Sequence, residues 1–218
     1  MRLFITVLSL TLLLAPFVVA QEPGAAVAQE TSAIELPQPV KQGGKPLMQA
    51  LAERRSEREF SREALAPQVL SNLLWAAFGV SRPDGRRTAP TARNRQDMDV
   101  YVALAEGLYL YEAKEHHLKP VVKGDLRALT GTQAFVGEAA LNLVYVAPIA
   151  SGAGEEPLLY AGAHAGFISE NVYLFCASEG LATVVRASIE REALARAMRL
   201  PADRRIILAQ TVGKRKQP

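Results

Sequence analysis

The stretch FISENVYLFCASEGLATVVR, Phe167 to Arg186, runs from a helix directly into a strand. Val172 and Phe175 occupy apolar positions at helical spacing, and Gly180 suits the C′ position that follows many helices. The β-branched run ATVVR comes next and predicts a strand. We therefore expect a long helix over residues 157–179 that the glycine closes and a strand follows.

Helices and strands alternate irregularly on both sides of this stretch. The patterns predict helices over 46–54, 66–79 and 189–198, a hairpin over 99–113, and strands over 141–147 and 204–212. There is no regular β-α-β order and no internal repeat. The sequence therefore predicts an α+β fold, with a central mixed sheet flanked by helices.

The first two helices differ in their apolar patterns. Leu47, Ala50 and Leu51 mark one face of the first helix, which we expect to pack on the core. Apolar residues cover most of the second helix, which we expect to be largely buried before it ends at Gly79.

The N-terminal 20 residues have the pattern of a secretory signal peptide. Arg2 precedes an apolar run from Leu3 to Val19, and small residues stand before Gln21. The run is nearly long enough to be a membrane anchor, but Pro16 and its end favour cleavage. We expect a signal peptide over 1–20, a linker or extended arm over 21–44, one folded domain over 45–218, and a periplasmic or secreted protein.

Composition excludes several classes of partner and site. The chain has 25 basic and 22 acidic residues, and loss of Arg2 with the signal leaves 24 against 22, a net charge of +2. So small an excess argues against a module for nucleic acid or anionic lipid. Cys176 is the only cysteine, and no cysteine or histidine stands at metal-ligand spacing from it. We assign no metal and expect His116 and His117 to be surface polar groups rather than acid–base catalysts. His164 lies near the start of the long helix, within reach of the cleft, and is not assigned to the site.

Polar, basic stretches interrupt the apolar pattern at three places: ERRSERE at 53–59, RRTAPTARNRQ at 86–96 and GKRK at 213–216. Arg54, Arg55 and Arg58 lie within five residues of one another. Guanidinium groups at this spacing can bind a phosphate while one of them contacts another part of the same ligand. The alternative for the first stretch is a solvated helix end, and for the second a charged surface loop.

Taken in order along the chain, these stretches resemble the nitroreductase family of FMN-dependent flavoproteins, and within it the branch of azoline-oxidising thiazole/oxazole dehydrogenases. The resemblance covers about residues 34–213, through the pieces IELPQP, ALAERRSEREF, LSNLLWAAFGV, GRRTAPTA, GLYLYEAKEHHL, GTQAFVGEAALNLVYVA, AGFISENVYLFCASEGLATVV and QTVG. It implies a nitroreductase-like fold, an intertwined homodimer and FMN as cofactor.

The resemblance also implies a set of cofactor-binding residues. By the resemblance, Arg54, Arg55 and Ser56 contact the FMN phosphate and ribityl chain. Arg58 lies beside the flavin N1 and C2 carbonyl. The other matching positions are Gln133 at the pyrimidine edge, Ala187 and Ser188 near N5 and O4, Lys214 and Arg215 at the phosphate, and Thr91, Ala92 and Asn94, which reach the flavin of the other subunit.

The expected activity is that of an oxidoreductase in which FMN, and no catalytic side chain, passes electrons or hydride to a small planar acceptor. The chain lacks the adjacent Lys-Tyr pair that the azoline-oxidising branch uses for proton removal, so a nitroaromatic or quinone-like acceptor is expected instead. The alternative is a non-catalytic flavin-binding or interaction protein that keeps the fold. Because soluble NAD(P)H is cytoplasmic, an exported protein needs another donor, which the sequence does not name.

Overall fold

A computed structural model of the chain describes residues 32–150 and 152–217. The predicted signal peptide and residues 21–31 of the predicted arm lie outside this range. In the described part, seven strands form one sheet in the order β1-β4-β3-β2-β5-β7-β6. Their bounds are β1 Ile34–Glu35, β2 Asp99–Ala103, β3 Gly107–Glu112, β4 His117–Lys123, β5 Leu141–Pro148, β6 Leu181–Arg186 and β7 Arg204–Lys214.

The predicted α+β class is confirmed, with one correction to the sheet. We expected a mixed sheet, but every strand pair within the described residues is antiparallel. The hairpin of β2 and β3 and the strand β5 were predicted, whereas β1 and β4 were not. β4 contains Pro120, which disfavours a strand, and Pro120 pairs with Tyr109 where the ladder is irregular.

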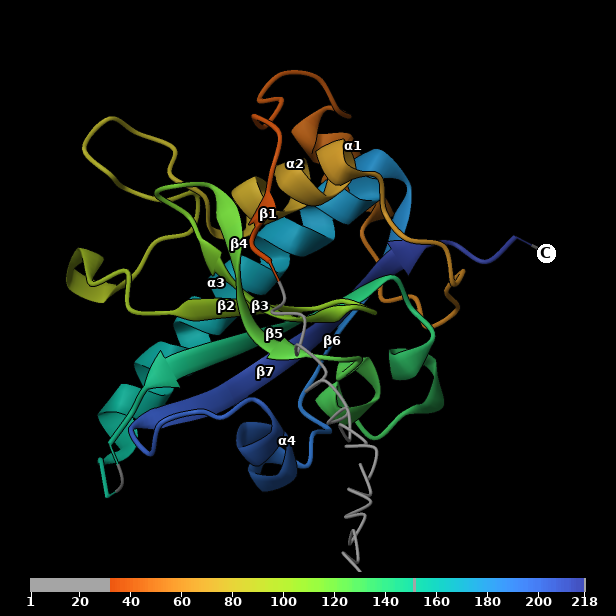
Figure 1. The fold of residues 1–218 in the computed structure, drawn as a ribbon. Helices are drawn as coiled ribbons and strands as arrows, with labels where there is room; N and C mark the ends of the chain where they lie inside the picture. Colours follow the sequence, from red (N-terminus) through yellow and green to blue (C-terminus); the bar gives the residue numbers. More distant parts are fainter. Residues whose placement is uncertain (1–31, 151, 218) are drawn as a thin grey trace, which may run out of the picture.

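The described residues contain four α-helices: α1 Leu47–Glu53, which packs on α3 rather than on the sheet, α2 Pro67–Phe78, α3 Glu155–Glu179 and α4 Arg191–Ala197. Both α2 and α3 cover one face, and α4 lies on the other (Figure 1). The central strand β5 explains this two-sided packing. Leu143 and Tyr145 point into the core under α2 and α3, while Val144 and Val146 point into the core on the side of α4. A strand buried on both faces therefore carries a continuous apolar run.

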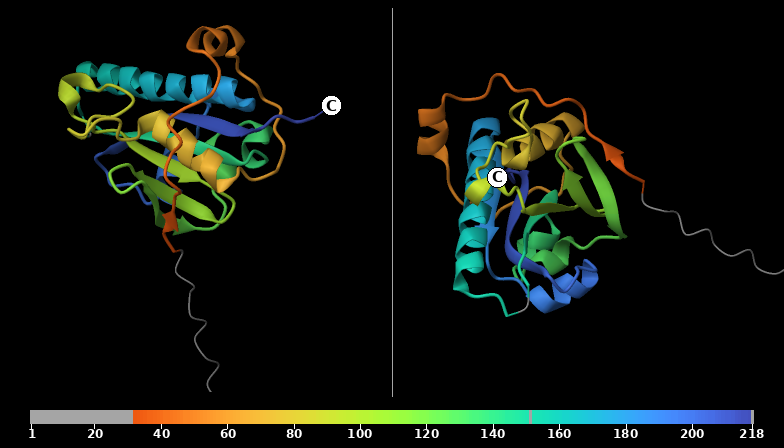
Figure 2. Two further views of the ribbon diagram at one scale, coloured as in Figure 1. Left: turned by 90° about the horizontal axis from the view of Figure 1, so that it is seen from above. Right: turned by 90° about the vertical axis from the view of Figure 1, so that its left-hand side faces the viewer.

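The long helix α3 reaches across the sheet as a straight rod, as Figure 2 shows from two directions. Ile168 and Val172 are fully buried against the sheet, and Gly180 ends the helix in the left-handed conformation at φ 72°. The prediction made for residues 157–186 is therefore confirmed. None of the described helices is long and apolar enough to cross a membrane.

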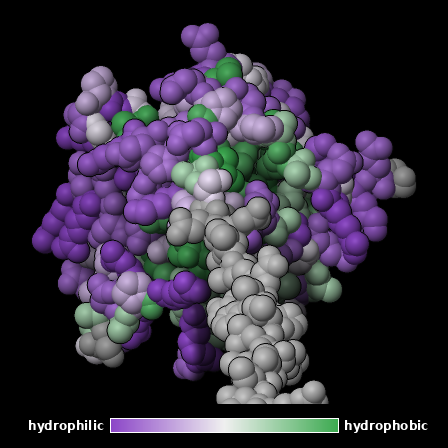
Figure 3. Space-filling model, viewed as in Figure 1, coloured by the Kyte–Doolittle hydropathy of each residue, from purple (hydrophilic) through white to green (hydrophobic). Residues whose placement is uncertain are grey.

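Apolar side chains are left exposed on two helices. On α1, Ala50 is buried, but Leu47 is 63% exposed and Leu51 is 44% exposed, so the predicted core-facing side of this helix is wrong. On α3, Leu159 is 72% exposed and Phe167 is 47% exposed. The face drawn in Figure 3 is mainly hydrophilic around a smaller central group of apolar side chains. The second helix, α2, is largely buried as expected.

Candidate functional site

The arginine-rich segment 54–60 lies along the outer edge of the sheet. Strand β6 is the last strand, and the Glu57 N–H donates to the Thr183 carbonyl at 2.9 Å. A few residues later, the Ser61 N–H donates to the Lys214 carbonyl at 2.9 Å, and Phe60 pairs with Arg215. Backbone bonds therefore hold the segment beside the ends of β6 and β7, which bear other predicted site residues.

Tyr173 of α3 fixes the first half of this segment. Its hydroxyl lies 2.7 Å from the Ser56 hydroxyl and accepts the Val185 N–H at 3.0 Å. The Arg54 guanidinium lies over the same ring, 5.2 Å from its centroid. Since the tyrosine oxygen accepts from Val185, one side chain joins the predicted phosphate segment to α3 and to β6.

Glu57 links two of the predicted phosphate ligands. Its carboxylate receives Arg55 Nε at 2.9 Å and Arg215 Nη2 at 3.0 Å. Arg215 Nε is nevertheless buried without a hydrogen-bond partner. Lys214 pairs with Glu63. Our sequence analysis missed Glu57, although it stands inside the ERRSERE stretch and two arginines flank it closely.

A ledge of two turns lies beyond the end of β6. The Thr132 N–H donates to the Ser188 carbonyl at 3.1 Å, which joins the turn before Gln133 to the turn after β6. Gln133, Ala187 and Ser188 are all exposed on this ledge. Phe60 and Phe135 stack with centroids 5.5 Å apart, so the arginine segment and the ledge adjoin one another.

A buried cation supports the ledge from beneath. Arg186 is only 6% exposed, and its guanidinium donates to the Thr130 carbonyl at 2.6 Å, to Asn142 Oδ1 at 2.7 Å and to Thr211 Oγ1 at 2.7 Å. These acceptors are all neutral, and burial lowers the pKa of Arg186 to about 10. A Cβ on Gly131 would lie 2.1 Å from Arg186 Nη1, so the guanidinium requires a glycine there.

The second predicted group, Thr91, Ala92 and Asn94, lies elsewhere in the chain. The Ala92 N–H donates to His164 Nε2 at 2.8 Å, near the first turns of α3. Tyr173, which marks the arginine cluster, stands nine positions further along α3, about 13 Å at 1.5 Å per residue. The structure thus brings the other nine predicted site residues together around β6 and leaves these three apart.

The loop that holds this second group is strained. Arg93, Asn94 and Gln96 have φ of 54°, 51° and 52°. For residues other than glycine this left-handed conformation costs roughly 1–2 kcal/mol each, and somewhat less for asparagine. Thr91 Oγ1 accepts the Gln96 N–H at 2.9 Å and closes the turn.

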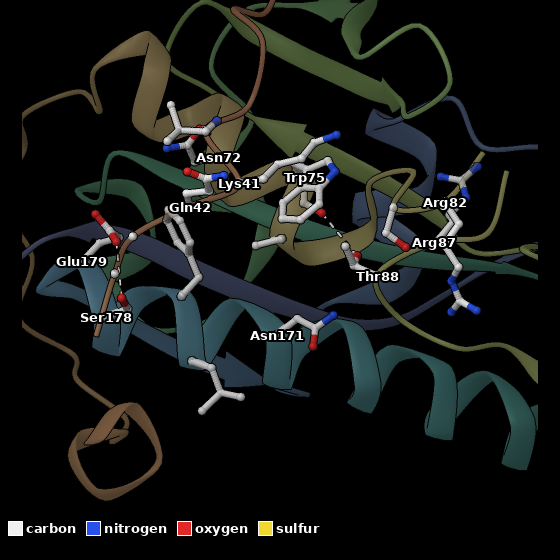
Figure 4. A pocket seen from close by; sticks show the side chains of 17 residues that line it. Lys41, Gln42, Asn72, Trp75, Arg82, Arg87, Thr88, Asn171, Ser178 and Glu179 are labelled. Atoms are coloured by element: carbon white, nitrogen blue, oxygen red, sulfur yellow. Dashed lines mark hydrogen bonds between the residues drawn. The ribbon is translucent and has the colours of Figure 1, made fainter. Parts of the chain in front are cut away.

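A cavity of about 650 Å³ lies beside this loop, between α2, α3 and residues 40–44. In Figure 4, Trp75 projects from α2 into the middle, Lys41 extends alongside it, and Arg82 and Arg87 stand at the opposite side. The Lys41 ammonium lies 5.4 Å from the indole centroid. Glu179 also lines the cavity, on the side away from Arg82 and Arg87, so a planar ligand that carries negative charge would suit the part beside Trp75 and the basic side chains.

His116 is a structural group rather than the surface group that we expected. Because Ser71 Oγ donates to the Pro37 carbonyl at 2.6 Å, it accepts from His116 Nε2 at 2.8 Å. His116 Nδ1 then accepts the Tyr111 hydroxyl at 2.9 Å. The imidazole is therefore neutral in this arrangement, and burial lowers its pKa.

Comparisons with known proteins identify the family. The model of the Nitroreductase family matches residues 51–214. The chain belongs to the nitroreductase family. A crystal structure of a nitroreductase-type protein from Ralstonia eutropha JMP134 is 42% identical to it, with a TM-score of 0.81 over 91% of this chain and 97% of that one. MJ1384 of Methanocaldococcus jannaschii carries the name nitroreductase. It is 30% identical to this chain over 151 residues, which are 63% of this chain and 76% of MJ1384.

A more distant structure shows the same fold. The NADPH:FMN oxidoreductase of Vibrio harveyi, solved with NAD+, is 17% identical and has a TM-score of 0.59 over 78% of this chain and 69% of that one. The nitroreductase family consists in general of flavin-dependent oxidoreductases. For this nitroreductase-family protein, the cluster around β6 is consequently the candidate flavin site.

Proposed function

We propose that this nitroreductase-family protein is an exported, FMN-dependent oxidoreductase that passes electrons or hydride to a small planar acceptor, such as a nitroaromatic or a quinone. One observation carries the proposal: a cluster of cationic side chains stands beside β6, in which Arg55 and Arg215 share Glu57 and Lys214 pairs with Glu63. Within the described part of the chain, Arg54 and Arg58 form no ion pair, and Arg215 Nε is buried with no acceptor. Guanidinium groups in this state suit a phosphate.

The residues around β6 can be divided between the two ends of FMN, its phosphate and its ring. The phosphate would be held by Arg54, Arg55, Ser56, Lys214 and Arg215, and the ring by Arg58, Gln133, Ala187 and Ser188. Bound FMN supplies the two-electron chemistry. The protein would supply a positive charge at Arg58 and, on the exposed ledge, the backbone of Ala187 and Ser188.

A homodimer would complete the site. In one chain, Ala92 is held at His164, whereas the arginine cluster lies at Tyr173, nine residues or about 13.5 Å further along α3, and a second copy would bring its own loop to the flavin. The exposed face of α3 supports this association: Leu159 and Phe167 flank Gly162 and Gly166, where an added Cβ would meet nothing. Small residues between large apolar ones allow two helices to approach closely.

The cavity beside the 85–96 loop supports the choice of acceptor. Arg87 and Thr88, at the start of this loop, line it together with residues 171–179 of α3, so an acceptor held there would lie between the start of the loop and the C-terminal half of the helix. Its aromatic wall and three basic side chains favour a planar, negatively charged molecule over an aliphatic one.

The export part of the proposal rests on the first 20 residues of the sequence. A donor other than soluble NAD(P)H would then serve the protein, because it would act outside the cytoplasm. A polypeptide exported without a twin-arginine signal would also acquire FMN after crossing the membrane.

The flavin spectrum of the purified protein tests the proposal. We expect a yellow protein whose absorbance bleaches with dithionite and returns when a nitroaromatic or quinone is added. A colourless protein that does not take up FMN would overturn it. Tight FMN binding without reoxidation by any acceptor would favour the alternative, a non-catalytic flavin-binding protein.

A further inference from the structure

The strained loop 91–96 depends on one buried side chain from a distant part of the chain. His164 is 4% exposed, and its Nε2 accepts the Ala92 N–H at 2.8 Å. A nitrogen that accepts a hydrogen bond carries no proton, so this imidazole bears its proton on Nδ1. The loop is therefore fastened to α3 by a neutral histidine in a defined tautomer.

Asp97 faces the other ring nitrogen of the histidine. His164 Nδ1 faces Asp97 Oδ1 at 3.6 Å, and this carboxylate oxygen is buried without a hydrogen-bond partner. On the other side, the Tyr160 ring stacks on the imidazole with centroids 6.2 Å apart. A carboxylate beside Nδ1 favours the proton on that nitrogen and so leaves Nε2 free to accept.

We propose that His164 is a positioning residue that holds Ala92, and with it the strained turn at 93–96, in the shape that reaches the partner's flavin. The functional half of this inference rests on the proposed FMN site. Three left-handed residues persist only where surrounding contacts impose them, and the bond from Ala92 to His164 is the contact that ties this turn to the helix. Without it the turn relaxes, and the backbone at its exposed arginines is free to take the extended conformation that a protease cleaves.

Trypsin provides a readout that is independent of activity, because Arg93 and Arg95 are exposed in the loop itself. We expect His164→Phe, which keeps a ring against Tyr160 but removes the acceptor, to be cleaved after these arginines about tenfold faster than the wild type. A factor of ten corresponds to about 1.4 kcal/mol, within the range of one hydrogen bond. His164→Gln supplies an amide oxygen, and we expect it to restore most of the resistance.

Ser169→Ala is the matched control. Ser169 is 5% exposed, lies on the same helix, and bonds through its hydroxyl to the Gly166 carbonyl rather than to the loop. We expect its cleavage rate to match that of the wild type. Equal rates in His164→Phe and the wild type, or an equal acceleration in Ser169→Ala, would overturn the inference.

Hydrogen exchange of the unmodified protein tests the same bond if His164→Phe does not fold. The Ala92 amide should exchange at least tenfold more slowly than the Arg93 amide, and an unprotected Ala92 amide would contradict the inference. FMN titration separates the two proposals: if the wild type binds no FMN, the proposed function fails while the proteolysis result still reports on His164. If it binds, we expect His164→Phe to raise the Kd about tenfold.

Discussion

The hydroxyls of Ser56 and Tyr173 lie 2.7 Å apart, and this contact joins the arginine segment to the long helix. Because the tyrosine oxygen also accepts the Val185 N–H, removing it leaves a backbone donor of β6 without its partner. We expect Tyr173→Phe to lower the free energy of unfolding by about 1–3 kcal/mol and to weaken FMN binding. Urea denaturation and FMN titration measure both effects. Tyr160→Phe is the control, because it removes a hydroxyl from the same helix at a residue that is 42% exposed. It should change neither the free energy of unfolding nor FMN binding.

Arg54 and Arg58 should have separable effects on the flavin. If Arg54 holds the phosphate, Arg54→Ala should mainly weaken FMN binding. If Arg58 lies beside N1, Arg58→Ala should lose roughly 1–3 kcal/mol of preference for the reduced form, a drop in midpoint potential of roughly 20–65 mV at about 30 mV per 1.4 kcal/mol. Potentiometric titration measures the shift. Arg196→Ala, at a 75% exposed side chain on α4, is the control, and an unchanged potential in Arg58→Ala would mean a merely solvated arginine.

Arg186 and Gly131 should be strongly coupled. Gly131→Ala places a Cβ 2.1 Å from Arg186 Nη1, and we expect it to cost about 2 kcal/mol or more of stability. In an Arg186→Met background the obstacle is gone, so the added cost of Gly131→Ala should fall below about 1 kcal/mol. A double-mutant cycle by urea denaturation gives the coupling. Additive effects would show that the guanidinium and the turn adjust independently.

His116 should make the protein less stable as the pH falls from 7 towards 5. Burial lowers the pKa of His116 in the folded state, so below pH 7 the unfolded chain takes up this proton first, and folding stability is lost. His116→Asn keeps a residue that tolerates the positive φ of 54° and removes the titration. We expect a smaller loss of stability between pH 7 and pH 5 in this variant. The prediction is wrong if the urea midpoints show that the wild type and His116→Asn lose the same amount of stability between pH 7 and pH 5.

Trp75 is the only tryptophan in the chain and lines the cavity beside the loop, so its fluorescence reports on occupancy. We expect 4-nitrobenzoate, a planar nitroaromatic anion, to quench it saturably. Lys41→Gln removes the ammonium near the indole and should weaken the apparent affinity severalfold. Lys216→Gln, at an exposed site outside the cavity, should have no effect. Identical affinities in the wild type and Lys41→Gln would contradict an anion-favouring pocket.

Local patterns predicted those elements whose burial follows from their own sequence. The apolar run of β5 is buried on both faces, and Gly180 ends α3 where the pattern placed it. Periodicity alone could not tell that the apolar face of α1 stays open, because the same pattern suits packing on the core or on another chain. β4 was missed because pairing with β3 outweighs the cost of Pro120.

The candidate site was partly readable in the same way. Arg186 stood out as a charge in an apolar strand, and Glu57 as an acid among arginines, so both carried a local signal that our reading left unused. The bond between Ala92 and His164 joins residues 72 positions apart and has no local signal. Contacts that depend on how α3 lies against a loop follow from tertiary packing, which one sequence does not encode in a readable pattern.

The arginine segment also covers part of the open side of β6. The Glu57 N–H donates to the Thr183 carbonyl of β6, and further along the Ser61 N–H donates to the Lys214 carbonyl at the end of β7. An uncovered terminal strand is a template on which other chains add, and proteins in general cover or charge such edges to avoid it. A change that detaches this segment would thus put solubility at risk along with the cofactor, so aggregation should accompany flavin loss in any variant that frees it.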